Sequence, residues 1–131
     1  MREAQEDSEK AIMTHIEKIK RIAEIEFADI VKSAYMVDFK LRIVLINNSF
    51  IDIHLSKKLR NKFGFHWECM DANSTIYRYD NFPDKKWQSI ATFPYHFHNG
   101  SQDAVEASPF PSTIFDGFRT FMELVKSKIK K

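Results

Sequence analysis

Three pairs of polar residues stand two positions apart, in segments where polar and apolar residues alternate. The pairs are His66 and Glu68, Arg78 and Asp80, and His96 and His98. Side chains two positions apart on a β-strand point to the same face of the sheet, so each pair shares a face of its own strand. If the three strands are neighbours, imidazoles, a guanidinium and carboxylates meet on one surface.

The first interpretation of this surface is acid–base catalysis. Imidazole titrates near neutral pH, so His96 and His98 can take a proton from a ribose 2′-hydroxyl and return one to a leaving oxygen. Arg78 would bind a phosphate through two hydrogen bonds and stabilise its developing charge, and Asp80 would orient a histidine or Arg78. These roles describe a metal-independent endoribonuclease that acts on RNA and needs no cofactor. The second choices for site residues are His66, Glu68 and Asn81.

Two other interpretations of the same residues remain open. In one, His96 and His98 bind a divalent metal ion together with Asp80 or His66, because an HxH spacing on a strand is a pattern of metal ligands. In the other, the residues have no chemical role: Arg78 and Asp80 form an ion pair, and the histidines are exposed or hydrogen-bonded to the backbone. Spacing alone does not separate the three interpretations.

The rest of the sequence predicts the elements that position these residues. Apolar residues recur every three or four positions over residues 9–23 and 113–128, which predicts two helices. The expected strands are 27–37, 41–46, 50–55, 63–70, 75–80 and 90–97. The pattern favours an α+β fold, an antiparallel meander of five or six strands flanked by an N-terminal and a C-terminal helix. We expect residues 1–131 to form one domain.

Composition excludes several classes of protein. The three glycines, Gly64, Gly100 and Gly117, are too far apart for a phosphate-binding loop or a dinucleotide fingerprint. The single cysteine, Cys69, excludes a disulfide framework and favours a cytoplasmic protein. The charged N-terminus is not a signal peptide, and no apolar run is long enough to cross a membrane. A net charge of +2 neither requires nor excludes a nucleic acid.

Several of these segments resemble the TumE family. The segments are Phe65-His66-Trp67, Tyr77 to Pro83 (YRYDNFP), Thr92 to His98 (TFPYHFH), Gly100, and Val105 to Ser108. Family members carry, in the same order, a YHW-like strand, an R-[YW]-DNAP segment and a TFPHHKH-like segment. TumE proteins are toxin components of type II toxin–antitoxin pairs and are encoded beside a helix-turn-helix antitoxin. The resemblance therefore implies a prokaryotic toxin with a protein antitoxin of helix-turn-helix type as its partner.

The chain departs from the family pattern at four positions. Asp84 and Lys85 stand where members often carry a histidine, Tyr95 replaces the first histidine of the TFPHHKH segment, and Phe97 replaces its lysine. If these groups contribute to activity, this chain is a weaker or diverged member. The retained residues are Arg78, Asp80, Asn81, His96 and His98. The alternative function is a non-catalytic binding module that engages a protein partner, and a second copy of the chain is a further candidate partner.

Overall fold

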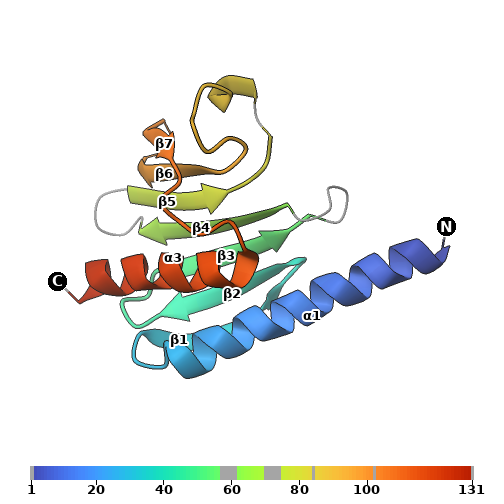
Figure 1. The fold of residues 1–131 in the computed structure, drawn as a ribbon. Helices are drawn as coiled ribbons and strands as arrows, with labels where there is room; N and C mark the ends of the chain where they lie inside the picture. The colour runs from blue at the N-terminus through green and yellow to red at the C-terminus, as the bar shows by residue number, and fades with distance from the viewer. Residues whose placement is uncertain (1, 57–61, 70–74, 84, 102, 131) are drawn as a thin grey trace.

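The computed structural model describes residues 2–56, 62–69, 75–83, 85–101 and 103–130. These residues form one antiparallel sheet of seven strands, in which each strand pairs with its neighbour in the sequence. The strands are β1 (Val31–Val37), β2 (Lys40–Leu45), β3 (Phe50–Leu55), β4 (Phe63–Cys69), β5 (Thr75–Asp80), β6 (His96–Gly100) and β7 (Val105–Ala107). Helices α1 (Arg2–Glu26) and α3 (Ile114–Ile129) lie across one face of the sheet (Figure 1).

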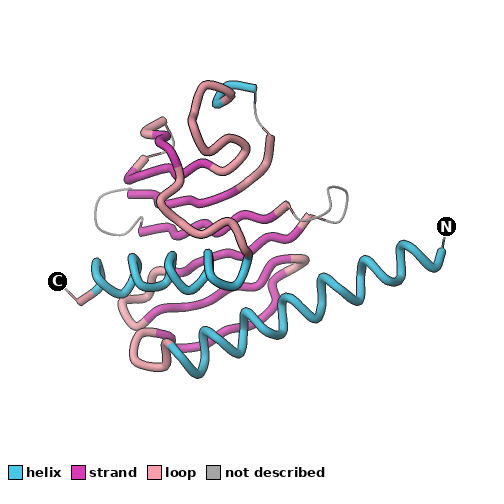
Figure 2. The backbone as a smooth tube through the Cα atoms, in the orientation of Figure 1, coloured by secondary structure: helices cyan, strands magenta, loops and turns pink. Residues whose placement is uncertain are grey.

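The α+β class and the two flanking helices are confirmed, but the predicted number of five or six strands is wrong. The missed strand is β7, which pairs with β6. Its three residues are too few to show the alternation that predicts a strand. The last expected strand, 90–97, is also displaced, because β6 begins only at His96. The connection before it is a long loop that contains the short 3-10 helix η1 (Lys85–Trp87) and extends beyond the sheet (Figure 2).

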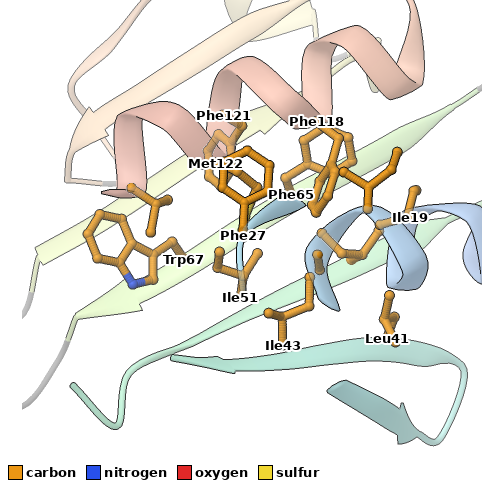
Figure 3. Packing of buried hydrophobic residues seen from close by; sticks show 14 of the residues in the cluster. Ile19, Phe27, Leu41, Ile43, Ile51, Phe65, Trp67, Phe118, Phe121 and Met122 are labelled. Carbon is orange, nitrogen blue, oxygen red and sulfur yellow. The ribbon is translucent and has the colours of Figure 1, made fainter. Parts of the chain in front are cut away.

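The two helices cover this face because its side chains are apolar. On β2 and β3, every second residue points toward the helices and is buried, namely Leu41, Ile43, Leu45, Ile51, Ile53 and Leu55. The helices contribute their own apolar faces, which include Ile16, Ile19, Ile22 and Ala23 from α1 and Phe118, Phe121, Met122 and Val125 from α3 (Figure 3). Removing these side chains from water is the main stabilising contribution to such a layered fold.

Ion pairs fix the end of α3 to the turn between α1 and β1. Asp29 in this turn lies 3.1 Å from Lys126 Nζ and 2.8 Å from Lys130 Nζ. Arg119 donates to both carboxylate oxygens of Glu26, the last residue of α1. Basic residues of α3, together with Lys130 directly after it, therefore contact the end of α1 and the turn that follows.

The start of α3 lies unusually close to β5. Tyr79 is buried and donates a hydrogen bond of 3.1 Å from its hydroxyl to the carbonyl of Pro111. Gly117 packs against both groups: a Cβ atom at this position would lie 2.8 Å from Pro111 O and 3.2 Å from Tyr79 Cε2. Tyr79 stands between Arg78 and Asp80 in the sequence, so α3 supports the strand that carries both.

Candidate functional site

The sheet face opposite the helices carries a row of polar side chains. Five consecutive strands, β2 to β6, place one such residue each in direct register, and the row is Arg42, Asp52, His66, Arg78 and His98. The row follows from the period of a strand, because Tyr77 and Tyr79 alternate with Arg78 and pack on the helix side. The predicted polar faces of β4, β5 and β6 therefore form one surface.

One end of this row consists of a partly exposed ion pair and a histidine that lies beside a carboxylate. Arg42 donates from Nε and Nη2 to the two oxygens of Asp52, at 2.9 and 3.0 Å. The guanidinium also lies 4.1 Å from the centre of the Phe50 ring. His66 Nε2 lies 3.4 Å from Glu68 Oε1. Burial lowers the pKa of His66 below its ordinary value, so this imidazole is neutral at neutral pH.

The other end of the row meets a buried group that we call the Asp–His cluster, formed by Asp80, His96 and His98. Asp80 Oδ1 lies 3.0 Å from His96 Nε2, and Asp80 Oδ2 lies 3.9 Å from His98 Nε2. The three residues are only 1%, 3% and 2% exposed, respectively. Arg78 contacts the cluster from the surface, with its Nε 2.8 Å from Asp80 Oδ2 and a third of its side chain exposed.

Residues from two segments lie against the Asp–His cluster. Gly64 on β4 is in register with Asp80, and a Cβ atom at this position would lie 3.4 Å from Asp80 Cβ. Trp87 of η1 packs against both imidazoles, with ring centres 6.4 Å from His96 and 6.1 Å from His98. The loop between β5 and β6 thus covers the histidines that β6 presents.

Asp80 and His96 shift the pKa of each other. Burial lowers the pKa of His96, but the hydrogen bond and the charge of Asp80 outweigh this effect, and the resulting pKa is raised. Burial raises the pKa of Asp80, yet the hydrogen bond from His96 and the charge of Arg78 lower it below the ordinary value. The His96 Nδ1 atom lies 3.0 Å from the carbonyl oxygen of Pro94, which can only accept, so Nδ1 donates. A protonated His96 can donate one hydrogen bond to Asp80 Oδ1 and one to the carbonyl oxygen of Pro94.

The four first-choice residues from the sequence lie together on this face, and His66 of the second choice stands beside Arg78 in the row. Asn81 has a different place. Its side-chain Oδ1 accepts a hydrogen bond of 2.8 Å from the Phe63 backbone N–H, so it joins β4 to the end of β5. Of the departures from the family pattern, Asp84 lies outside the described residues.

Sequence reasoning missed the residues that hold the cluster in place. Gly64 is informative in the sequence only for phosphate-binding loops, and nothing in the sequence predicts that Trp87 or Pro94 contacts the histidines. The HxH spacing predicts that both imidazoles share a face, but a spacing cannot show that the preceding loop returns over them.

The arrangement contains the groups for two kinds of chemistry. Two imidazoles, a carboxylate and a guanidinium are the groups that proton transfer at a phosphodiester requires. The same two imidazoles and carboxylate also bring one potential ligand atom each within 4.8 Å of one another, which is close enough to share a metal ion.

A protein-family model described as Toxin TumE matches residues 12–129, which is most of the chain. Neither the curated proteins nor the solved structures that were compared with the chain gave a match. In the described part of the chain, neither helix contains an apolar stretch of the length that a bilayer crossing needs.

Proposed function

The chain belongs to the TumE toxin family, and from this premise we propose that it is the toxin of a type II toxin–antitoxin pair and that it acts by cleaving RNA. The observation that carries the proposed activity is the Asp–His cluster with Arg78 at its surface. In this cluster, two imidazoles that can exchange protons lie near a guanidinium that can bind phosphate.

Arg78 is the proposed phosphate ligand. A third of its side chain is exposed, whereas the carboxylate that it contacts is buried. Its Nε faces Asp80, so the terminal guanidinium nitrogens are the ones that an RNA phosphate would meet. A planar guanidinium binds a phosphate through two parallel hydrogen bonds and stabilises the extra charge of the transition state.

His96 and His98 are the proposed proton carriers. In cleavage of RNA, the 2′-oxygen attacks phosphorus and loses its proton, the P–O5′ bond breaks, and the leaving 5′-oxygen takes up a proton. His98, directly across from Arg78 in the register, is the proposed acceptor. His96, which Asp80 and Pro94 favour as an imidazolium, is the proposed donor. The products are a 2′,3′-cyclic phosphate and a 5′-hydroxyl.

Access to the cluster requires a change at Trp87. The indole packs against both imidazoles, which are almost fully buried. We propose that an RNA base takes the place of this ring against the histidines when the phosphate binds Arg78, since bases and aromatic side chains stack interchangeably.

Inducible expression in bacteria tests this proposal. His96→Ala and His98→Ala should abolish toxicity while circular dichroism shows a folded protein, because losing one acid–base group costs about 10²–10⁴-fold in rate. His15→Ala, on α1 and away from the cluster, is the matched control and should stay toxic. The purified protein should release cyclic-phosphate ends from RNA in the presence of a chelator. If both cluster variants remain toxic, the assignment of proton transfer to these two histidines is wrong.

The proposed partner is a protein antitoxin of the helix-turn-helix type. A neighbouring reading frame with a helix-turn-helix pattern should restore growth when it is expressed together with the toxin. A frame of that kind that binds the protein but leaves growth inhibited would contradict the pairing.

A further inference from the structure

The Asp–His cluster has the donor atoms of a metal centre, and we propose that it binds one divalent transition-metal ion of the zinc class. Asp80, His96 and His98 each offer one ligand atom, these atoms lie within 4.8 Å of one another, and all three residues are buried. Three protein ligands of this kind leave a fourth position for water in tetrahedral sites.

The distances are close to those of a tetrahedral site. Ligands bound at ~2.0–2.1 Å lie about 3.3 Å apart around a tetrahedral centre. His96 Nε2 lies 3.0 Å from Asp80 Oδ1, and His98 Nε2 lies 3.9 Å from Asp80 Oδ2, on either side of this value. The three ligand atoms lie within 4.8 Å of one another, so the side chains would draw together around a bound ion.

The surroundings orient the ligands. The Nδ1–H of His96 donates to Pro94 O, so the proton that the imidazolium gives up to a metal ion is the one on Nε2, the atom that faces Asp80. Metal-bound histidines are commonly held in this way by a backbone carbonyl. Asp80 Oδ2 is buried and, among the described residues, accepts no hydrogen bond, although Arg78 contacts it as an ion pair. An ion bound by the carboxylate would satisfy this oxygen.

The donor set selects the metal. Two imidazoles and one carboxylate suit Zn²⁺, Co²⁺ and Ni²⁺, whereas Mg²⁺ and Ca²⁺ prefer oxygen ligands. The positive charge of Arg78 beside Asp80 weakens the binding of any cation, so affinity depends on the nitrogen ligands.

On the basis of the proposed function, a metal ion bound here would also inhibit the toxin. A metal ion occupies the Nε2 atoms of both histidines, which are the atoms that proton transfer would use. The metal-bound protein is therefore the inactive form of the proposed ribonuclease, and zinc regulates the site by occupying it.

Titration of the purified chain with Co²⁺ tests the binding. The wild type should show the visible absorption of tetrahedral Co²⁺ with a stoichiometry of one, and Zn²⁺ should abolish it while Mg²⁺ should not. His98→Asn and Asp80→Asn should weaken binding by at least about tenfold. His66→Asn, a histidine on the same face outside the cluster, should bind as the wild type does. Absent absorption, or equal binding by all variants, would overturn the proposal.

A second measurement needs no variant. The chain has two tryptophans, and only Trp87 packs against the cluster, whereas Trp67 lies on the helix side. Paramagnetic Co²⁺ in the cluster should broaden the Trp87 indole signal strongly and the Trp67 signal much less, and equal broadening would exclude the site. Activity is judged separately: if zinc activates cleavage, the metal site stands and the proposed proton transfer fails.

Discussion

Replacing Gly117 by alanine tests the close contact between α3 and β5. In an ordinary helix this change stabilises the protein by at most about 1 kcal/mol, because alanine is the better helix former. Here the new Cβ atom would lie 2.8 Å from the carbonyl oxygen of Pro111. The obstacle is backbone, so α3 or the segment before it must move.

The expected cost follows from these two effects. Forcing one extra carbon into a packed region costs about 1–3 kcal/mol, and a backbone obstacle held by the Tyr79 hydrogen bond belongs in the upper part of that range. After the gain in helix propensity is subtracted, Gly117→Ala should lower the free energy of unfolding by about 1–2 kcal/mol. Urea unfolding should show a midpoint lower by about 0.5–1 M.

Gly64→Ala is the matched control, since it adds the same carbon on the other face of the sheet. At this position, the new Cβ atom would lie 3.4 Å from Asp80 Cβ and 3.8 Å from Phe82 Cε2, which are ordinary contacts. Glycine inside a strand is unfavourable by roughly 0.5–1 kcal/mol, so this variant should be as stable as the wild type or more stable. If Gly117→Ala also raises the midpoint, the close packing of α3 on β5 is wrong.

Three further variants test the charged and titratable groups. Asp80→Ala should destabilise the protein by about 3–5 kcal/mol in urea unfolding, because it leaves Arg78 and His96 without their buried counter-charge. A loss of stability below about 1 kcal/mol would show that the carboxylate is not paired. Burial raises the pKa of Tyr79 to about 12, so its contribution to stability is present below pH 10 and is lost as the pH rises toward 12. Tyr79→Phe should reduce that loss, and an unchanged pH profile would contradict it. Hydrogen bonds from Lys130 and Lys126 lower the pKa of Asp29 to about 2, so its contribution is present above about pH 4 and is lost as the pH falls toward 2. A carboxylate NMR titration of Lys130→Gln should show a higher Asp29 midpoint than the wild type shows.

Much of the fold could be predicted because the deciding signals are local. The alternation in β3 predicts its bounds correctly, Phe50–Leu55, and the apolar spacing of α3 predicts that helix to within one residue at each end. Strand β7 could not be predicted, because its three residues form a strand by pairing with β6, and the position of β6 was itself predicted incorrectly. Residues 27–30 were assigned to the first strand, but they form a turn in which the N–H of Val31 bonds to the carbonyl of Phe27.

The candidate site was predictable in its members but not in its burial. A spacing of two residues predicts that Arg78 and Asp80 share a face of their strand, and the same holds for His96 and His98. Because β5 pairs with β6, the two pairs of residues lie next to each other. The cover over the histidines comes from Trp87, nine residues before His96 on an irregular loop. No periodic pattern encodes such a contact, because it depends on tertiary packing alone.

Each strand of the sheet is hydrogen-bonded to the strand made just before it, so the sheet can grow as the ribosome releases the chain. Pairings between strands that follow one another in the sequence are more local than pairings between distant strands, and local contacts form quickly. A nascent chain that ends before His96 already contains Arg78 and Asp80 but has neither imidazole of the cluster. The apolar side of β5 stays uncovered for longer still, because α3 is the last element to be made. We therefore expect the complete cluster to form only when synthesis of the chain is nearly finished. The antitoxin then has the whole period of translation in which to be present before the cluster is complete.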